Sequence, residues 1–281
     1  AGFEDVLEIN RHVRRDIYGL APDPLPTLIP RDRRLGVAER MRADGTVETA
    51  LDEAALPALI ERIAALGAEC VAVTLLNSHA NPAHERLLAV RIAAALPDLP
   101  VSISADVSPE IREYERSSTT VLNALLVPVV RAYLDRLERR IGEDGFSPAI
   151  FLVQSNGGVC SLRTAAEQPA RLLLSGPSGG VLAAARIATL IGRPDLVAVD
   201  MGGTSFDVSV IRGGRGSIVT QGEIDRLPVR LPMVEMRTIG AGGGSIAAVD
   251  AGGRLTVGPR SAGATPGPVA YGRGGAEPTV T

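Results

Sequence analysis

The pattern of apolar and polar positions is most regular between residues 52 and 105. Residues 56–66 place apolar side chains at helical spacing and stop at Gly67, a common helix end. Residues 70–76 form an apolar run that is typical of a buried strand. Residues 82–96 predict a helix that begins at a proline, and residues 101–105 predict a second strand. This order predicts a right-handed crossover in a parallel sheet, and therefore an α/β fold.

The segments on either side of this region are less regular. Residues 2–14 predict a helix, and the four prolines within residues 21–30 predict an extended or turning segment. Ser108-Pro109 predicts a helix start, with a long helix over residues 121–141. The run from Ser117 to Thr120 puts four hydroxyl residues into helical sequence, where they lower helix propensity with no evident return.

Two further apolar runs lead directly into polar, glycine-rich loops. Residues 149–153 predict a buried strand that ends at the loop 154–158. Residues 172–174 lead in the same way into the loop 175–180, and an alanine-rich helix follows over residues 181–191. Ligands of open α/β sheets bind at the carboxyl ends of strands, and helix N-termini bind anions, so both loops are candidate binding elements.

The clearest local signal is a β-hairpin over residues 196–211. An apolar run ends in Asp200, and Gly202-Gly203 then permits a tight turn. From Phe206 to Ile211 apolar and polar residues alternate, as in a strand that runs back beside the first one.

The tip of this hairpin gathers groups that bind phosphate and Mg²⁺. Glycine amides approach a phosphate closely, and the hydroxyls of Thr204 and Ser205 donate to its oxygens. The carboxylates of Asp200 and Asp207 are suited to Mg²⁺ or to its water ligands. A plain glycine turn between two core strands is the alternative interpretation, and the two aspartates argue against it.

Composition excludes several functional classes. The chain has 281 residues, 45% of them hydrophobic and 22% charged, which suits a soluble core. The net charge of −3 argues against nucleic acid as a partner. None of the 29 basic residues is lysine, which excludes a Walker phosphate loop. No apolar run has the length of a membrane span and no signal peptide is visible, so we expect no membrane partner.

The cysteines and histidines show no metal-site spacing. Cys70 and Cys160 lie far apart, which predicts buried thiols in a reducing, cytoplasmic compartment. A nucleophilic role for Cys160, which follows two glycines, is the alternative. His79 and His84 do not stack on one helical face, so capping or surface roles are favoured over metal binding.

The hairpin resembles the second phosphate loop of the superfamily of sugar kinases, heat-shock chaperones and actin. Further runs resemble one family within it, the hydantoinase A, 5-oxoprolinase and acetone carboxylase β-subunit family, and they follow the family's order along nearly the whole chain. These runs are residues 81–86, 108–123, 154–158, 174–180, 200–207, 238–247 and 258–275.

The resemblance implies an ATPase built from two ribonuclease H-like lobes, both incomplete in this chain. Residues 1–192 would be the remainder of the first lobe with its connecting helix, and residues 193–281 the start of the second lobe. Family members carry an earlier phosphate loop that is not found here. We therefore expect the isolated chain to have little or no ATPase activity, because both loops are needed to hold the γ-phosphate.

The resemblance implies that ATP is used to activate a carbonyl group. In the mechanism that it implies, the carbonyl oxygen is phosphorylated. The resemblance therefore implies an ATP-dependent hydrolase of a cyclic amide, such as a hydantoin or 5-oxoproline, working with a hydantoinase B-type partner subunit. An ATP-dependent carboxylase subunit acting on a ketone is the first alternative, and a non-enzymatic actin- or chaperone-like ATP switch is the second.

The implied site combines Mg²⁺ ligands with phosphate-binding loops. Asp200 and Asp207 are assigned to catalysis and to Mg²⁺. The residues assigned to ATP are Gly202, Gly203, Thr204, Ser205, Gly176, Ser178, Gly179, Gly180, Gly242, Gly243 and Gly244. This chain departs from the family at Glu235 and Arg237, where Asp and His are frequent, and at Ala270, where Cys is frequent. No metal or nucleophile role is assigned to those positions.

Overall fold

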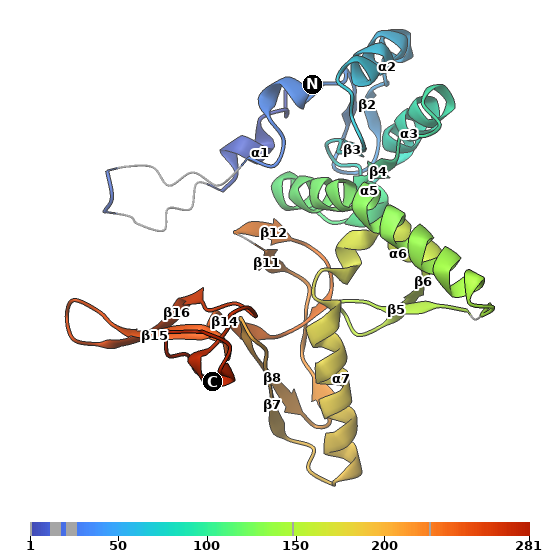
Figure 1. The fold of residues 1–281 in the computed structure, drawn as a ribbon. Coiled ribbons are helices and arrows are strands. Elements are labelled where there is room, and N and C mark those ends of the chain that lie inside the picture. The colour runs from blue at the N-terminus through green and yellow to red at the C-terminus, as the bar shows by residue number, and fades with distance from the viewer. Residues whose placement is uncertain (1, 12–17, 21–26, 148, 225) are drawn as a thin grey trace. The chain divides into compact units, whose positions relative to one another are not determined.

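The chain contains both helices and strands in the computed structural model, which describes residues 2–11, 18–20, 27–147, 149–224 and 226–281, and strands predominate after residue 190 (Figure 1). The predicted mixed α/β class is confirmed. The α-helices are α1 (Val6–Ile9), α2 (Leu56–Ala65), α3 (Ala83–Ala95), α4 (Ser104–Val107), α5 (Glu113–Glu143), α6 (Leu162–Glu167) and α7 (Ser175–Leu190). Short 3₁₀ turns are η1 (Arg31–Arg33), η2 (Glu53–Ala55), η3 (Pro169–Leu172) and η4 (Val269–Tyr271).

The strands are short and form several small sheets. Those before α7 are β1 (Arg40–Met41), β2 (Val47–Thr49), β3 (Val71–Val73), β4 (Val101–Ile103), β5 (Phe151–Val153) and β6 (Val159–Ser161). Those after α7 are β7 (Leu196–Met201), β8 (Phe206–Arg212), β9 (Arg215–Gly216), β10 (Ile218–Val219), β11 (Gly222–Ile224), β12 (Leu227–Val229), β13 (Met233–Val234), β14 (Arg237–Ile239), β15 (Ser245–Val249) and β16 (Leu255–Ser261).

Contacts divide the chain into two compact units. Unit 1 comprises Ala1–Leu152, Val159–Leu173 and Thr220–Pro232. Unit 2 comprises Val153–Gly158, Leu174–Val219 and Met233–Thr281. The expected division at residue 192 differs from this one for two physical reasons: α7 packs against β7 and β8, and β12 packs against α5.

Unit 1 contains the predicted crossover. β3 and β4 pair in parallel, with Val71 opposite Val101 and Val73 opposite Ile103, and α3 connects them. Apolar side chains of α2, α3, both strands and the segment after β2 form the core here, namely Leu51, Leu56, Ile63, Val73, Leu88, Ile92 and Ile103. The helix at the N-terminus is shorter than predicted, and residues 12–17 and 21–26 lie outside the described part of the chain.

The long helix α5 begins at Glu113 with Arg112 at its N-cap position, whereas the Ser108-Pro109 signal predicted a helix start four residues earlier. Ser108 instead closes the short helix α4, and Arg112 takes a positive φ of 83°, which interrupts helical geometry before α5. By length and composition α5 is apolar enough to cross a membrane, contrary to our expectation, yet half of its most apolar stretch is buried inside the structure. Such burial is typical of a core helix.

The four hydroxyl residues of α5 are buried and fully used. Thr119 and Thr120 each donate to a main-chain carbonyl four residues earlier, at 2.7 Å. Ser117 donates to the Thr74 hydroxyl at 3.2 Å, and Ser118 donates to the carbonyl of Pro228 at 2.9 Å. Small side chains let neighbouring strands approach the helix closely, so the return for their low helix propensity is tertiary packing.

The strands β11 and β12 pair as a hairpin that is tied to the start of α5. The Arg230 amide donates to the Thr119 hydroxyl at 2.9 Å, and the Arg230 guanidinium donates to Glu110 at 2.8 Å. Ser108 donates to the Arg230 carbonyl at 3.1 Å. Hydrogen bonds between Arg230 and residues 108–119 therefore hold the β11–β12 hairpin in unit 1.

Glu85 is a completely buried carboxylate that joins three segments of unit 1. It accepts hydrogen bonds from the Leu75 amide, the Ser104 hydroxyl and the Ala105 amide at 2.7–2.9 Å. We expect Glu85→Ala to lower the free energy of unfolding by about 3 kcal/mol or more, because these donors lose their acceptor away from water. Urea unfolding followed by circular dichroism measures the effect.

The matched control for this prediction is Glu61→Ala. Glu61 is an exposed glutamate on α2, and we expect its removal to leave the unfolding curve almost unchanged. Equal shifts for the two variants would contradict the structural role of Glu85.

Unit 2 is organised around a sheet with the strand order β14-β8-β7, to which β9 adds beside β8. The pair β7–β8 is the predicted hairpin, in antiparallel register from Leu196–Ile211 to Met201–Phe206. One face of the sheet packs on α7: Leu196, Ala198 and Ile211 contact a cluster that includes Val181 and Ala188.

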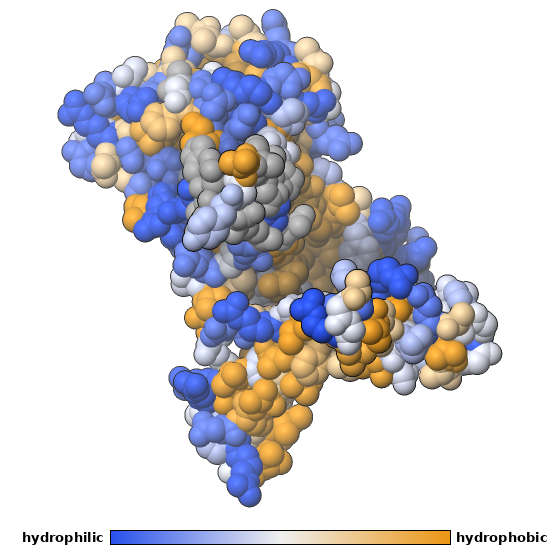
Figure 2. Space-filling model, turned by 90° about the vertical axis from the view of Figure 1, so that its left-hand side faces the viewer, coloured by the Kyte–Doolittle hydropathy of each residue, from blue (hydrophilic) through white to orange (hydrophobic). Residues whose placement is uncertain are grey.

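The other face of this sheet is apolar and exposed. Val197, Val199, Met201, Val210 and Ile239 share it by strand alternation, and each is 45–61% exposed. Figure 2 shows apolar side chains gathered in the lower part of the view, where β7, β8 and α7 lie. Contiguous exposed apolar groups are uncommon on monomeric proteins. In its exposure this face differs from the opposite face of the sheet, which α7 covers.

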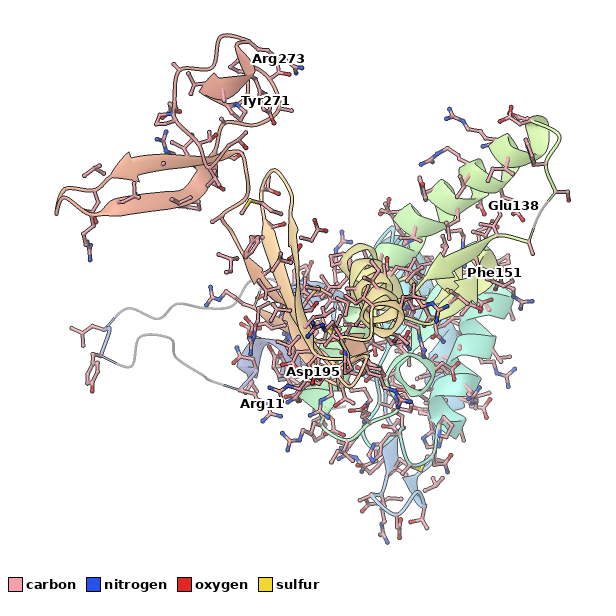
Figure 3. All side chains as sticks on the ribbon, turned by 90° about the horizontal axis from the view of Figure 1, so that it is seen from below. Arg11, Glu138, Phe151, Asp195, Tyr271 and Arg273 are labelled. Atoms are coloured by element: carbon pink, nitrogen blue, oxygen red, sulfur yellow. The ribbon has the colours of Figure 1, made fainter. Side chains whose placement is uncertain are left out.

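The last part of unit 2 is the antiparallel hairpin β15–β16 and a glycine-rich loop. Ser245 pairs with Ser261 and Val249 with Leu255, and Ile246 forms a single bridge to Thr279. In the loop, the Arg273 guanidinium lies 5.6 Å from the centre of the Tyr271 ring, and Figure 3 labels both side chains. This segment brings the chain end back to the strand that follows Gly244.

Candidate functional site

The two predicted aspartates lie side by side on the hairpin. Asp200 and Asp207 are cross-strand partners in β7 and β8, so their side chains leave the same face of the sheet. Thr238 of β14 pairs with Asp207 from the other side and continues the row. Its hydroxyl donates to Asp207 Oδ1 at 2.6 Å. We call Asp200, Asp207 and Thr238 the acidic row.

The acidic row lies on the face of the sheet that α7 covers. Alternation along β7 and β8 puts Ala198 and Ile211 on that face, and these residues pack in the α7 cluster. The row lies beyond them, toward the hairpin tip. Asp200 is exposed and Asp207 half-buried, so the carboxylates are accessible to a bound ion.

The hairpin tip leaves main-chain donors available. The Gly202 amide donates to the Ser205 carbonyl at 3.0 Å and closes the turn. Among the residues that the structure describes, no hydrogen bond is donated by the amides of Gly203, Thr204 or Ser205. Free amides beside small residues are suited to the oxygens of a phosphate.

The glycine loop 240–244 supports this tip from behind. The Gly243 amide donates to the Gly202 carbonyl at 2.9 Å, and the Gly244 amide donates to the Gly203 carbonyl at 2.7 Å. A Cβ on Gly242 would lie 2.6 Å from the main-chain atoms of Gly203, Thr204 and Ser205, so only glycine fits there. These glycines were assigned to ATP, and the structure places them against the tip of the β7–β8 hairpin, so their direct role toward ATP stays a prediction.

The first turns of α7 differ from the predicted loop. Residues 175–180 are helical, and the strand expected over residues 172–174 is absent, because Leu172 ends η3 and residues 173–174 form a turn. Ser178 is fully buried, and its hydroxyl donates to the carbonyls of Ser155 and Leu174 at 2.8 and 2.7 Å. This hydroxyl ties α7 to the loop 154–158, and its assignment to ATP stays a prediction.

The glycines of α7 remain open. No atom lies within 4 Å of the position that a Cβ would take on Gly176, Gly179 or Gly180. Within the described residues no hydrogen bond joins these turns to the hairpin tip. Their role as the facing wall of a phosphate site therefore stays a prediction.

The loop 154–158 holds the start of α7. The Ser155 hydroxyl accepts from the Leu174 amide at 3.2 Å, and the Ser155 carbonyl also accepts from the Val234 amide at 2.7 Å. Asn156 accepts from the Gly158 amide at 2.8 Å and shapes the turn. The motif thus fixes local structure in unit 2.

The acidic row fits Mg²⁺ as far as its donors go. Mg²⁺ is commonly bound through one or two carboxylates, with water and substrate phosphate as the other ligands. Two like charges directly opposite each other in a sheet are unfavourable, and a cation between them removes that cost. Within the described residues no group of three or more His, Cys, Asp or Glu side chains is placed to hold a metal. A site here would therefore need oxygens from water and phosphate.

His79, His84 and the two cysteines have structural environments. His84 Nδ1 lies 2.8 Å from Glu39, and His79 Nδ1 accepts from Arg116 at 3.0 Å. Cys160 is buried in a core with Leu134, among other residues. Burial raises the pKa of the Cys70 thiol, with a smaller contribution from the Glu69 charge, which disfavours the reactive thiolate.

Sequence reasoning did not assign a role to Thr238. The residue stood inside a glycine-rich run that matched the family, and its pairing with Asp207 depends on the register of β14 against β8. Two local features did favour a strand at Thr238: threonine favours strands, and the glycine-rich run begins just after a short alternating stretch. The register itself is a tertiary property.

Family models cover most of the chain. A model described as hydantoinase/oxoprolinase matches residues 116–281, and one described as the hydantoinase/oxoprolinase N-terminal region matches residues 1–96. The chain belongs to the hydantoinase/oxoprolinase family. The resemblance seen in the sequence motifs is thereby confirmed.

Individual relatives of this family member act on different carbonyl compounds. The α-subunit of caprolactamase from Pseudomonas jessenii is 41% identical over 282 residues, which cover the whole chain and 40% of the relative. The γ-subunit of acetophenone carboxylase from Aromatoleum aromaticum is 37% identical over 298 residues, again covering the whole chain and 40% of the relative. The chain therefore spans about two fifths of the length of these relatives.

Solved structures agree with this grouping. The crystal structure of ATP-dependent caprolactamase from Pseudomonas jessenii superposes with a TM-score of 0.87 at 41% identity, over 100% of this chain and 41% of that one. The nucleotide-free structure of acetone carboxylase superposes with a TM-score of 0.78 at 30% identity, over 99% of this chain and 41% of that one. The fold described above is thus shared with these two proteins.

Proposed function

We propose that the full-length protein carrying this chain is an ATP-dependent hydrolase subunit that activates the carbonyl of a cyclic amide. The acidic row at the hairpin tip carries the proposal, because it places two carboxylates beside free main-chain amides. The 41% identity to an ATP-dependent caprolactamase supports the substrate class. We also propose that the two units belong to ribonuclease H-like lobes of the actin and sugar-kinase type.

In this proposal, the residues of the hairpin position ATP. Bound Mg²⁺ would neutralise charge on the phosphates, and Asp200 and Asp207 would hold it or its waters. The amides of Gly203, Thr204 and Ser205 would donate to phosphate oxygens, while the amides of Gly243 and Gly244 hold the carbonyls of Gly202 and Gly203. An array of donors that is fixed before the reaction costs no rearrangement during it.

The chemistry follows from the weak reactivity of an amide carbonyl. The carbonyl oxygen attacks the γ-phosphorus and ADP leaves. Water then adds to the activated carbon, the ring C–N bond breaks, and the nitrogen departs as an amine after taking up a proton. A second water releases phosphate and leaves the carboxylate. Much of the protein's contribution is positioning and charge neutralisation.

A ketone carboxylase subunit is the second candidate, supported by the 37% identity to the acetophenone carboxylase γ-subunit. Because this and other relatives are named as subunits, we propose a partner subunit of the hydantoinase B type. A non-enzymatic ATP switch of the actin or chaperone type is the remaining alternative.

The test is ADP formation by the purified full-length protein with its partner subunit. We expect caprolactam, hydantoin or 5-oxoproline to stimulate ADP formation at least several-fold, since ATP is consumed in activating the substrate. Stimulation by acetone or acetophenone with bicarbonate, and not by cyclic amides, would favour the carboxylase. ADP formation that responds to none of these compounds would contradict both enzyme proposals and favour the switch.

A further inference from the structure

The Asp207 carboxylate is held by one specific side-chain donor. Thr238 Oγ1 lies 2.6 Å from Asp207 Oδ1, which is the range of a charge-assisted bond from a hydroxyl to a carboxylate. The two residues are direct cross-strand partners in β14 and β8. The sheet therefore fixes the spacing of their side chains before any ligand arrives.

The row is asymmetric. Asp207 is the middle member, with Thr238 on one side and Asp200 on the other. The hydrogen bond engages one carboxylate oxygen on the β14 side, so the second oxygen stays free for a cation shared with Asp200. Among the described residues, the one side-chain hydrogen bond in the row is that from Thr238 to Asp207. No side-chain hydrogen bond of this kind from the described part of the chain orients the Asp200 carboxylate.

We propose that Thr238 is a positioning residue that orients the Asp207 carboxylate for the divalent cation of the nucleotide complex. The inference rests on the proposed function, since it assumes that the acidic row holds this cation. Thr238 does not bind the metal itself. Its hydroxyl selects one carboxylate orientation out of several, and so reduces the rearrangement that metal binding requires.

A purely structural role is the competing explanation. Threonine is common in strands because its branched side chain fits a pleated surface, and Thr238 is exposed. The substitution Thr238→Val separates the two roles, because valine keeps the shape and the strand preference and removes only the hydroxyl. Thr238→Ser keeps the hydroxyl.

The readout is Mn²⁺ affinity of the full-length protein, measured by electron paramagnetic resonance in the presence of a non-hydrolysable ATP analogue. We expect Thr238→Val to weaken Mn²⁺ binding roughly 10-fold, the scale of one hydrogen bond to a charged group. Thr238→Ser should lie within about 3-fold of the wild type. Thr256→Val is the matched control in strand β16, where the hydroxyl donates to a main-chain carbonyl, and should not change the affinity.

The variant Asp207→Asn distinguishes failure of the inference from failure of the proposed function. If Asp207→Asn weakens Mn²⁺ binding and Thr238→Val does not, the positioning role is wrong and the metal site stands. If neither variant changes Mn²⁺ binding, the metal site itself is wrong. If Thr238→Val weakens binding only together with a lower melting temperature, and Thr238→Ser does not restore binding, the role is structural and the inference is overturned.

Discussion

Gly242→Ala in the full-length protein is expected to lower substrate-stimulated ADP formation by about 100-fold, the cost of moving catalytic groups by around 1 Å. The added Cβ would lie 2.6 Å from main-chain atoms of Gly203, Thr204 and Ser205. Real Cβ contacts are essentially never this short, and the neighbours are main-chain atoms that cannot rotate away. The tip must therefore move, and the main-chain amides that we propose as phosphate donors move with it.

Gly240→Ala is the control for this prediction. It adds the same methyl group two residues earlier in the loop, where no atom lies within 4 Å and φ is not positive. We expect it to retain near wild-type turnover. Equal turnover in the Gly242 and Gly240 variants would show that the loop does not support the phosphate-binding tip.

Asp200→Asn and Asp207→Asn are expected to lower the same activity by on the order of 100-fold or more, because charge stabilisation at a bound metal contributes several kcal/mol. Folding should change little, since both side chains lie near the tip of the hairpin, and Asp200 is exposed. Asparagine keeps the volume and one carbonyl oxygen and removes the charge.

Asp195→Asn is the matched control, because it removes one negative charge from the same hairpin. Asp195, labelled in Figure 3, lies just before β7 and accepts from the Gly213 amide at 2.8 Å, which an asparagine carbonyl also does. Phosphate release and melting temperature are measured for all three variants. Wild-type turnover in both Asp200→Asn and Asp207→Asn would contradict the proposal that these aspartates hold Mg²⁺ or its waters.

The hairpin and the crossover could be predicted from sequence because their signals are local. Alternation from Phe206, the glycine pair and the apolar run before Asp200 specify β7 and β8 without reference to other segments. The apolar runs at β3 and β4 and the helix between them specify the parallel pair in the same way. Only the element ends differ, by a few residues.

Helix starts were harder to predict, because tertiary contacts decide them. Ser108-Pro109 has the composition of a helix start, yet the Ser108 hydroxyl donates to the Arg230 carbonyl, 122 residues away. Ser175 to Gly180 has the composition of a loop, yet the buried Ser178 hydroxyl ties these residues into α7. Propensity is a weak guide where such contacts exist.

The two aspartates of the candidate site could be identified from the sequence, whereas Thr238 and the arrangement of the site could not. Asp200 and Asp207 could be paired from the hairpin register alone. The position of Gly242 behind the tip and the bond from Thr238 to Asp207 join β14 and its following loop to β8, and no local pattern encodes that pairing. The pairing of strands that lie far apart in the chain cannot be deduced from the local patterns of a single sequence.

The proposed function requires the acidic row to hold the divalent cation of bound ATP. Crystals of the full-length protein grown with Mn²⁺ and a non-hydrolysable ATP analogue test this requirement directly through anomalous scattering at the manganese edge. We expect a manganese peak beside Asp200 and Asp207, with at least one carboxylate oxygen at a ligand distance or one water away. A nucleotide-bound manganese peak remote from both aspartates would show that the acidic row does not hold the cation.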